Sequence, residues 1–208
     1  MIEKLLPMEI ENKSFQIIKD ELTLPIDESL APIIYRCIHT SADFDYAKNL
    51  EFSKDLMNQA IKAITDNAII VTDTNMAKAG INKKHLEKLG GKVLNYISDE
   101  DVAKAAKENK TTRSAMAMKK AAQENKDLIF VVGNAPTALI EIHNMVVNEG
   151  LKPKLVIAVP VGFVNVIESK QLIKELDIPY VIASGRKGGS NIAAAIVNAI
   201  MYSALERE

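Results

Sequence analysis

A single cysteine, Cys37, is all that the 208-residue sequence contains. Because a disulfide needs two cysteines, none can form within the chain, and a metal site built on a cysteine cluster is excluded as well. A chain without disulfides suits a reducing compartment. We therefore expect a cytoplasmic protein.

The sequence also lacks an excess of charge of either sign. Its 26 basic residues face 27 acidic ones, and the formal net charge is −1. Nucleic acids and anionic membranes select basic surfaces. The charge balance therefore gives no bulk reason to expect either partner, and it leaves room only for a local basic patch.

Long apolar runs are missing too. Runs such as Leu155–Val161 fall far short of the roughly 20 residues that cross a bilayer. The segment Met1–Ile10 alternates charged and apolar residues and has no apolar stretch of the length that a signal peptide needs. We expect neither a membrane anchor nor an export signal.

No repeat, low-complexity tract or Gly/Ser-rich linker divides the sequence. The composition, 48% hydrophobic and 25% charged, is that of an ordinary globular protein. At this length one domain with its own core is the simplest expectation. We predict a single domain over residues 1–208.

From residue 66 onward, short aliphatic runs alternate with longer amphipathic segments. The runs have Val, Ile and Leu at both odd and even positions, which indicates strands buried on both faces. Five strands are predicted, at Ala68–Thr72, Lys92–Ile97, Leu128–Val132, Leu155–Val159 and Tyr180–Ala183. Strand–helix alternation of this kind predicts an α/β fold with a mainly parallel sheet and helices on both faces.

Helices are expected between these strands and ahead of them. Asn75–Leu89 and Asp99–Asn125 are each expected to form two helices, broken near Gly80 and near Lys110. Single helices are predicted at Pro136–Asn148, Val164–Leu176 and Ser190–Leu205. The first 65 residues are predicted to form a helical layer, with helices at Ser14–Leu22, from a Ser29 cap toward His39, and at Lys54–Ile64 with Ser53 as its cap.

Polar, Gly-bearing and Pro-bearing segments follow the predicted strands. They are Thr72–Met76, Ser98–Asp99, Gly133–Thr137, Pro160–Phe163 and Ser184–Ser190. In open α/β sheets, ligands bind outside the carboxyl ends of the strands. We therefore expect the ligand site at this edge of the sheet.

The segment after the fifth strand has the character of an anion site. Its glycines permit close backbone approach, the following helix start offers free N–H groups, and Arg186 and Lys187 add charge. A Gly-rich connection with solvated basic residues explains the same pattern. The Gly-x-x-x-x-Gly-Lys-Ser/Thr spacing of a P-loop is absent.

The segment Gly133–Thr137 has two interpretations as well: the start of a helix, or a degenerate dinucleotide-binding loop. Asn134 and Thr137 can cap a helix whose first position suits Pro136. The dinucleotide fingerprint Gly-x-Gly-x-x-Gly is missing, which argues against a dehydrogenase. The absence of Gly-x-Ser-x-Gly likewise argues against an α/β hydrolase.

Among the three histidines, His39 stands out because it ends a predicted helix and opens a polar turn. A helix C-terminus favours a charged imidazole, so His39 is a candidate proton donor, with a purely local capping role as the alternative. His85 is expected to be a solvated helix residue and His143 a surface or packing residue. No spacing of His, Asp and Glu predicts a metal site.

Taken together, six segments resemble the precorrin-8X methylmutase family, including its cobalt-precorrin-8 methylmutase branch. They are HTSADFDY (39–46), TDTNMAKAGI (72–81), TRSA (112–115), VGNAPTAL (132–139), PVGFVNVIESK (160–170) and GRKGGS (185–190). The resemblance implies an isomerase of corrin biosynthesis that moves a methyl group from carbon 11 to carbon 12 of the macrocycle. It implies no redox step and no external cofactor, and it leaves open whether the substrate carries cobalt.

The resemblance also implies residue roles and partners. It makes His39 the group that hydrogen-bonds to or protonates the macrocycle. It implies a homodimer, with other corrin-pathway enzymes as further partners. The substrate it implies is a flat tetrapyrrole, apolar on its faces and rimmed with carboxylates.

Such a ligand needs an apolar slot and many peripheral donors. Charged donors are available at Arg36, Arg113, Lys170, Arg186 and Lys187. Neutral donors are available at Thr40, Ser41, Thr74, Asn75, Asn134, Thr137 and Ser190. Met76, Val161 and Phe163 are candidates for the apolar walls or, equally, for the core. A carrier that binds a tetrapyrrole without chemistry is the alternative, and turnover of substrate separates the two.

Overall fold

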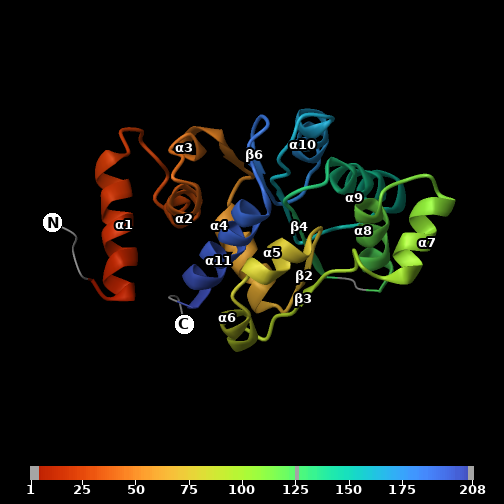
Figure 1. Ribbon diagram of the computed structural model, residues 1–208, viewed down its shortest axis with the longest axis horizontal. Helices are drawn as coiled ribbons and strands as arrows, with labels where there is room; N and C mark the ends of the chain where they lie inside the picture. Colours follow the sequence, from red (N-terminus) through yellow and green to blue (C-terminus); the bar gives the residue numbers. More distant parts are fainter. Residues whose placement is uncertain (1–4, 125–126, 206–208) are drawn as a thin grey trace.

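The fold is described by a computed structural model covering residues 5–124 and 127–205 (Figure 1). Two sequence expectations fall partly outside the described residues: the terminus Met1–Ile10, of which residues 1–4 are not described, and the helix end at Asn125. Within the described ranges, no helix is long and apolar enough to cross a membrane.

The molecule is organised around one six-stranded sheet. Its strands are β1 (Leu50–Phe52), β2 (Ile69–Thr72), β3 (Val93–Leu94), β4 (Leu128–Val132), β5 (Leu155–Ala158) and β6 (Tyr180–Ala183), in the order β1-β6-β5-β4-β2-β3. The last five are the predicted strands, and they pair in parallel. The sixth strand, β1, was not predicted and pairs antiparallel with β6.

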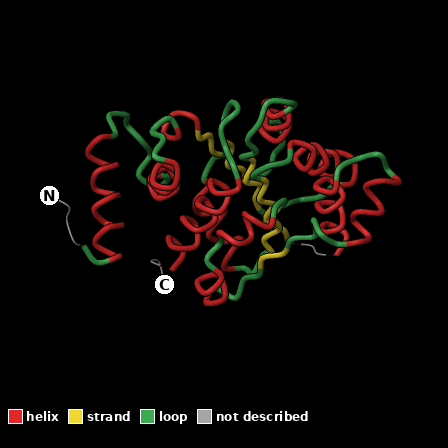
Figure 2. Tube along the Cα trace, viewed as in Figure 1, coloured by secondary structure: helices red, strands yellow, loops and turns green. Residues whose placement is uncertain are grey.

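Helices cover both faces of the sheet, as predicted (Figure 2). One face carries α4 (Leu56–Thr65), α5 (Asn75–Gly80), α6 (Lys83–Lys88) and α11 (Ser190–Leu205). The other carries α7 (Glu100–Glu108), α8 (Arg113–Glu124), α9 (Pro136–Glu149) and α10 (Val166–Lys174). Along β4, Ile129 and Val131 pack into the first layer, while Leu128, Phe130 and Val132 pack into the second. The continuous apolar run of β4 therefore has a partner on each side.

The first 65 residues are mainly helical, as expected, but only α4 of their helices lies in the layer on the sheet, and β1 belongs to the sheet itself. The helix α2 (Ala31–Ser41) packs against α11, and α1 (Pro7–Glu21) packs against α2, so both lie outside the layer that touches the strands (Figure 1). A short helix, α3 (Tyr46–Asn49), leads into β1.

Both predicted serine caps in this region are wrong. The Ser29 hydroxyl donates to Asp27, and α2 starts after Leu30. The Ser53 hydroxyl accepts from the backbone N–H of Tyr180 in β6, and α4 starts after Asp55. In each case the hydroxyl that was expected to cap the helix forms its hydrogen bond elsewhere, with Asp27 for Ser29 and with Tyr180 for Ser53.

The sheet has a topological switch point between β2 and β4. The chain leaves β2 for β3 on one side and later returns to β4 on the other. The helix that follows β2, α5, lies on one face, and α9, which follows β4, lies on the opposite face. The connections therefore diverge here, and ligands of open α/β sheets bind at such a crevice.

Candidate functional site

The crevice at the switch point is organised by a buried carboxylate. Asp73 directly follows β2 and is 1% exposed. It accepts hydrogen bonds from the backbone N–H groups of Gly133, Asn134 and Ala135, at 2.8–2.9 Å. Burial raises the pKa of Asp73, against the opposing effect of these hydrogen bonds. The loops after β2 and β4 are thus fixed to each other by one side chain.

Hydroxyl pairs extend this network along the carboxyl edge of the sheet. The hydroxyls of Thr74 and Ser190 lie 2.8 Å apart and join the start of α5 to the start of α11. Those of Thr112 and Thr137 lie 2.7 Å apart and join the start of α8 to the start of α9. Segments far apart in the sequence therefore share one edge.

Ion pairs connect the segment 39–46 to the loop that precedes α11. The ammonium group of Lys187 lies 2.6 Å from carboxylate oxygens of both Asp43 and Asp45. This pairing lowers the pKa of Asp43 and raises that of Lys187. Lys187 was predicted to bind substrate carboxylates, but in the structure its charge is already engaged by the protein.

Lys170 supports the same loop from below. Its side chain is 3% exposed, and its ammonium donates to the backbone carbonyls of Gly185 and Lys187 at 2.8 and 2.9 Å. A buried ammonium that already donates to two carbonyls of a neighbouring loop is a poor donor to an external carboxylate. The structure therefore gives Lys170 a supporting position behind the site.

Replacement of Lys170 by Met should change how stability depends on pH. Burial lowers the pKa of Lys170 to about 8, from 10.5 in the unfolded chain. Between these values the unfolded chain binds a proton that the folded one lacks, so raising the pH stabilises the fold. The wild type should gain up to about 3 kcal/mol across this window, and Lys170→Met should lack that gain.

Urea denaturation of both proteins from pH 7.5 to 10.5 measures the free energy of unfolding at each pH. Other groups that titrate in this range are present in both proteins, so their effects cancel in the difference. If the free energies of the two proteins changed in parallel with pH, Lys170 would not have the lowered pKa.

Helix N-termini give the carboxyl edge a positive character. Four helices, α5, α8, α9 and α11, begin at the hydroxyl pairs and loops described above, and the N-terminus of a helix carries positive partial charge. Arg113 and Arg186 stand exposed beside these starts. Among the described residues, neither guanidinium pairs with a carboxylate, so both remain available to an anionic ligand.

Exposed apolar side chains accompany these charges. Met76 is 71% exposed, Val161 48% and Phe163 83%. The Arg186 guanidinium lies over the Phe163 ring, 5.5 Å from its centroid. Neighbouring apolar and cationic groups left open to solvent are typical of a binding surface and not of a core. The alternative of core positions for these three residues is therefore not what the structure shows.

The remaining neutral candidates lie at or near this edge. Asn75 donates to the Ser98 hydroxyl at 3.3 Å, and Asn134 is exposed. Asn134 does not cap α9 with its side chain, and neither does Thr137, which pairs with Thr112 instead. Both side chains therefore depart from the capping role that the sequence allowed.

His39 lies in the last turn of α2, as predicted, and is exposed. Its ring packs against Phe15 of α1, with centroids 5.2 Å apart. Within the part of the chain that the structure describes, its imidazole makes no hydrogen bond. Thr40 is exposed beside it, while the Ser41 hydroxyl donates to the Cys37 carbonyl and accepts from the Asp43 N–H. Asp43 pairs with Lys187, so the α2 terminus adjoins the loop before α11.

Arg36 is the candidate that the structure does not bring to this edge. Its guanidinium pairs with Glu11 at 2.8 Å and lies over the rings of Phe15 and Tyr202. Tyr202 stands twelve residues beyond Ser190 on α11, or about 18 Å along a helix. Arg36 therefore binds α1 and α11 together, away from the helix starts.

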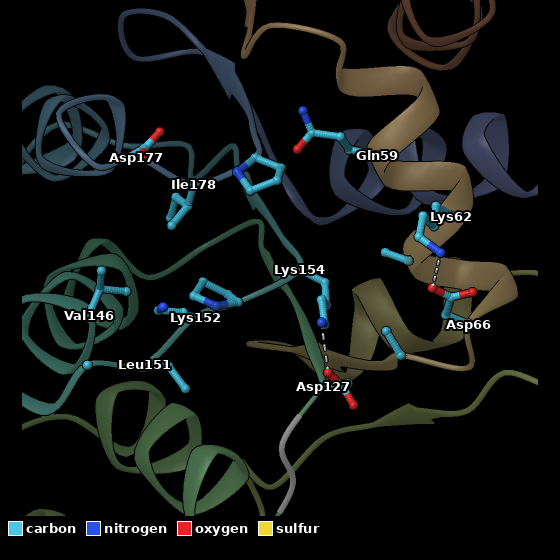
Figure 3. A pocket seen from close by; sticks show the side chains of 15 residues that line it. Gln59, Lys62, Asp66, Asp127, Val146, Leu151, Lys152, Lys154, Asp177 and Ile178 are labelled. Atoms are coloured by element: carbon cyan, nitrogen blue, oxygen red, sulfur yellow. Dashed lines mark hydrogen bonds and ion pairs between the residues drawn. The ribbon is translucent and has the colours of Figure 1, made fainter.

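A cavity of about 750 Å³ lies at the opposite edge, around the amino ends of the strands (Figure 3). Ion pairs of Lys62 with Asp66 and of Lys154 with Asp127 line it. The helices α4 and α9 end there, and helix C-termini carry negative partial charge. Three lysines and three aspartates line the cavity, so its lining has no net charge to attract a ligand rimmed with carboxylates.

Sequence reasoning missed Asp73, Thr112 and the pair Asp43 and Asp45 as parts of the site. All four stand inside the six segments noted above. A signal was present for Asp73, because an Asp directly after a strand buried on both faces must find buried partners. No local signal identifies Gly133–Ala135 as those partners.

These features give an α/β protein whose carboxyl edge exposes cationic and apolar groups side by side. Comparison with known proteins agrees, and the chain belongs to the precorrin-8X methylmutase family, whose model matches residues 9–203. This is a family of isomerases of cobalamin biosynthesis. The relationship covers every segment of the site.

Individual relatives support the assignment. The chain is 47% identical to cobalt-precorrin-8 methylmutase of Salmonella typhimurium, over 94% of this chain and 95% of that protein. It is 44% identical to cobalt-precorrin-8 methylmutase of Priestia megaterium, over 93% of this chain and 87% of that protein. The crystal structure of precorrin-8x methyl mutase from Thermus thermophilus matches with a TM-score of 0.88 and 33% identity, covering 95% of this chain and 98% of that one.

Proposed function

We propose that this protein catalyses the methylmutase reaction itself, in which a methyl group moves from carbon 11 to carbon 12 of precorrin-8X or cobalt-precorrin-8. The observation that carries the proposal is the convergence of all six family segments on one edge of the sheet. A carrier protein would need the ligand surface but no group placed to assist a rearrangement. The names of the relatives favour the isomerase.

The ligand surface suits both the apolar faces and the peripheral carboxylates of a tetrapyrrole. Met76, Val161 and Phe163 offer apolar contact to the faces of the macrocycle. Arg113 and Arg186 offer bidentate donors to the peripheral carboxylates, and the helix starts offer backbone N–H groups. Thr40, Thr74, Asn75, Asn134 and Ser190 supply neutral hydrogen bonds around the rim.

His39 supplies the one titratable group in this proposal that acts on the reacting ring. Its imidazole donates a hydrogen bond or a proton that strengthens as the methyl group migrates, which lowers the barrier without any external cofactor. We further propose that the substrate carries cobalt, in keeping with the names of the two relatives above. Cobalt on the ring nitrogens would direct His39 toward a ring carbon or a peripheral group.

Incubation of the purified protein with the metal-free and the cobalt-bearing substrates, followed by absorption spectroscopy, tests the proposal. Conversion to the more conjugated corrin is expected with at least one of them. Binding without a spectral change of the ring would replace the isomerase with the carrier.

Substitution of Arg186 by Ala should weaken corrin binding by about tenfold or more, because a charge-assisted hydrogen bond contributes roughly 1.5–3 kcal/mol. Titration of product into the protein measures the dissociation constant. Lys152→Ala, which removes a cation from the cavity at the opposite edge, is the matched control and should bind as the wild type does. Equal affinity of Arg186→Ala and wild type would remove this loop from the site.

We also propose that the protein acts in the cytoplasm, as a homodimer, and exchanges intermediates with other enzymes of corrin biosynthesis. The apolar side chains of Leu6, just before α1, and of Ile10 and Ile17 on α1 are 45–68% exposed and support an interface between two copies. Sedimentation equilibrium measures the oligomeric state, and a monomer at micromolar concentration would exclude the dimer.

A further inference from the structure

Asp73 is a buried charged group that the proposed chemistry does not use. Its carboxylate accepts the backbone N–H groups of Gly133, Asn134 and Ala135, the loop that leads into α9. Ala135 is the N-cap of α9, so its N–H is one of those that lack a partner within the helix. Such a position is usually filled by a cap from the helix itself. Here the residue at the cap position is Ala135, which has no side chain able to bond.

The local sequence offered a cap and the structure does not use it. Asn134 is a good capping residue type, yet its own N–H is bonded to Asp73 and its side chain is exposed. Thr137 likewise turns toward Thr112. Because the cap comes from the residue after β2, across the switch point, the Asn134 side chain is left free for other contacts.

We propose that Asp73 is a positioning residue: its carboxylate, placed just after β2, caps the N–H groups of the loop 133–135 that leads into α9 and thereby holds Asn134 at the carboxyl edge in the arrangement that binds the substrate rim. The inference rests on the proposed function for its ligand. The capping itself is independent of that ligand and can be measured without it.

Gly133 shows how tightly this loop is held. A Cβ built there would lie 2.7 Å from the Cα of Ser190, so the loop has no room to shift toward α11. Loss of the Asp73 carboxylate therefore leaves three N–H donors facing a space that water or a small anion can enter. The loop then loses the three hydrogen bonds that join it to the residue after β2.

Asp73→Ala, with added formate as a replacement carboxylate, tests the capping. Hydrogen exchange of the amides in residues 133–135 should be faster than in the wild type by tenfold or more, and 50–100 mM formate should slow it again. Asp99→Ala is the matched control, because it removes an exposed carboxylate from the same edge, one that pairs with Lys120. Exchange in that variant should match the wild type.

Product binding then tests the positioning. Asp73→Ala should bind product at least tenfold more weakly, and formate should restore affinity to within about threefold of the wild type in the same buffer. A merely structural Asp73 would lower the melting temperature without any response of affinity to formate. That outcome, in a variant still folded by circular dichroism, would overturn the proposal.

Asp73→Asn is the second variant, in case the alanine protein does not fold. It keeps the size of the side chain but sets an NH₂ donor against backbone N–H donors, so formate should not rescue it. In a double-mutant cycle, Asn134→Ala should cost little further affinity in the Asp73→Asn background, whereas Arg186→Ala should cost its full amount. Additive effects of Asp73 and Asn134 would contradict the proposal.

The two failures are distinguishable. If the wild type binds no corrin, the proposed function fails while the exchange experiment still reports on the cap. If the wild type binds corrin and Asp73→Ala binds equally well, only the positioning role fails.

Discussion

Replacement of His39 by Ala should lower the rate of methyl migration by about 10²–10⁴-fold, the usual contribution of a positioned acid–base group. The physical reason is that His39 acts on the ring as charge shifts, whereas the arginines and helix starts hold the rim in substrate and product alike. Affinity for product should therefore change little while turnover is largely lost. Single-turnover absorption kinetics beside product titration measure the two quantities separately.

The control for this variant is His143→Ala, which removes a half-buried histidine from α9. It should rearrange substrate at the wild-type rate. If His39→Ala also keeps the wild-type rate, His39 has no part in the chemistry. Loss of folding in His39→Ala would instead assign the histidine to the packing of α2 against Phe15.

Replacement of Gly188 by Ala should destabilise the protein by about 4 kcal/mol or more, which is at the upper end for a single substitution. Gly188 has a φ of +154°, and a Cβ there would overlap the carbonyl oxygen of Val159 at the end of β5. The same carbonyl accepts the N–H of Gly189 at 2.9 Å, so the loop cannot withdraw without breaking that bond. Urea denaturation at pH 7.5 measures the loss.

Gly185→Ala is the matched control within the same loop. Gly185 has a φ of +72°, but a Cβ there meets nothing within 4 Å. The substitution should cost only the backbone strain, about 1–2 kcal/mol. Equal destabilisation by the two variants would mean that strain, and not the close approach to Val159, makes glycine necessary at Gly188.

The central strands could be predicted from the sequence because their burial leaves a direct trace. Each of β4, β5 and β6 packs on both faces, so nearly every side chain is aliphatic and the run stands out. The strand β1 left no such trace. It has three residues with Glu51 in the middle, and Glu51 pairs with Lys174 of α10. Its pairing with β6 is a long-range event that a local pattern does not encode.

The site was predictable in place but not in detail. Strand-end segments indicated the edge, and the structure joins them there. Residue type alone suggested that Lys170 and Lys187 would bind the ligand. In the folded chain Lys170 donates to two carbonyls of the loop before α11, and Lys187 pairs with two aspartates. These partners are far away in the sequence and come close only on folding. The number of charged residues in a sequence does not reveal which of them pair with other groups of the protein itself.

The packing of α2 against α11 also bears on how the protein is made. The buried face of α2, with Ile33, Ile34, Cys37 and Ile38, belongs to the same apolar cluster as α11, whose last turns lie at the far end of the chain. During synthesis from the amino terminus, α2 emerges long before its partner exists. Contacts between residues so distant in sequence slow folding, and apolar surface that stays exposed in the meantime promotes aggregation. The α2 helix can bury this face only after α11 has been synthesised, so a chain that stalls before Ser190 exposes an apolar surface to which chaperones can bind.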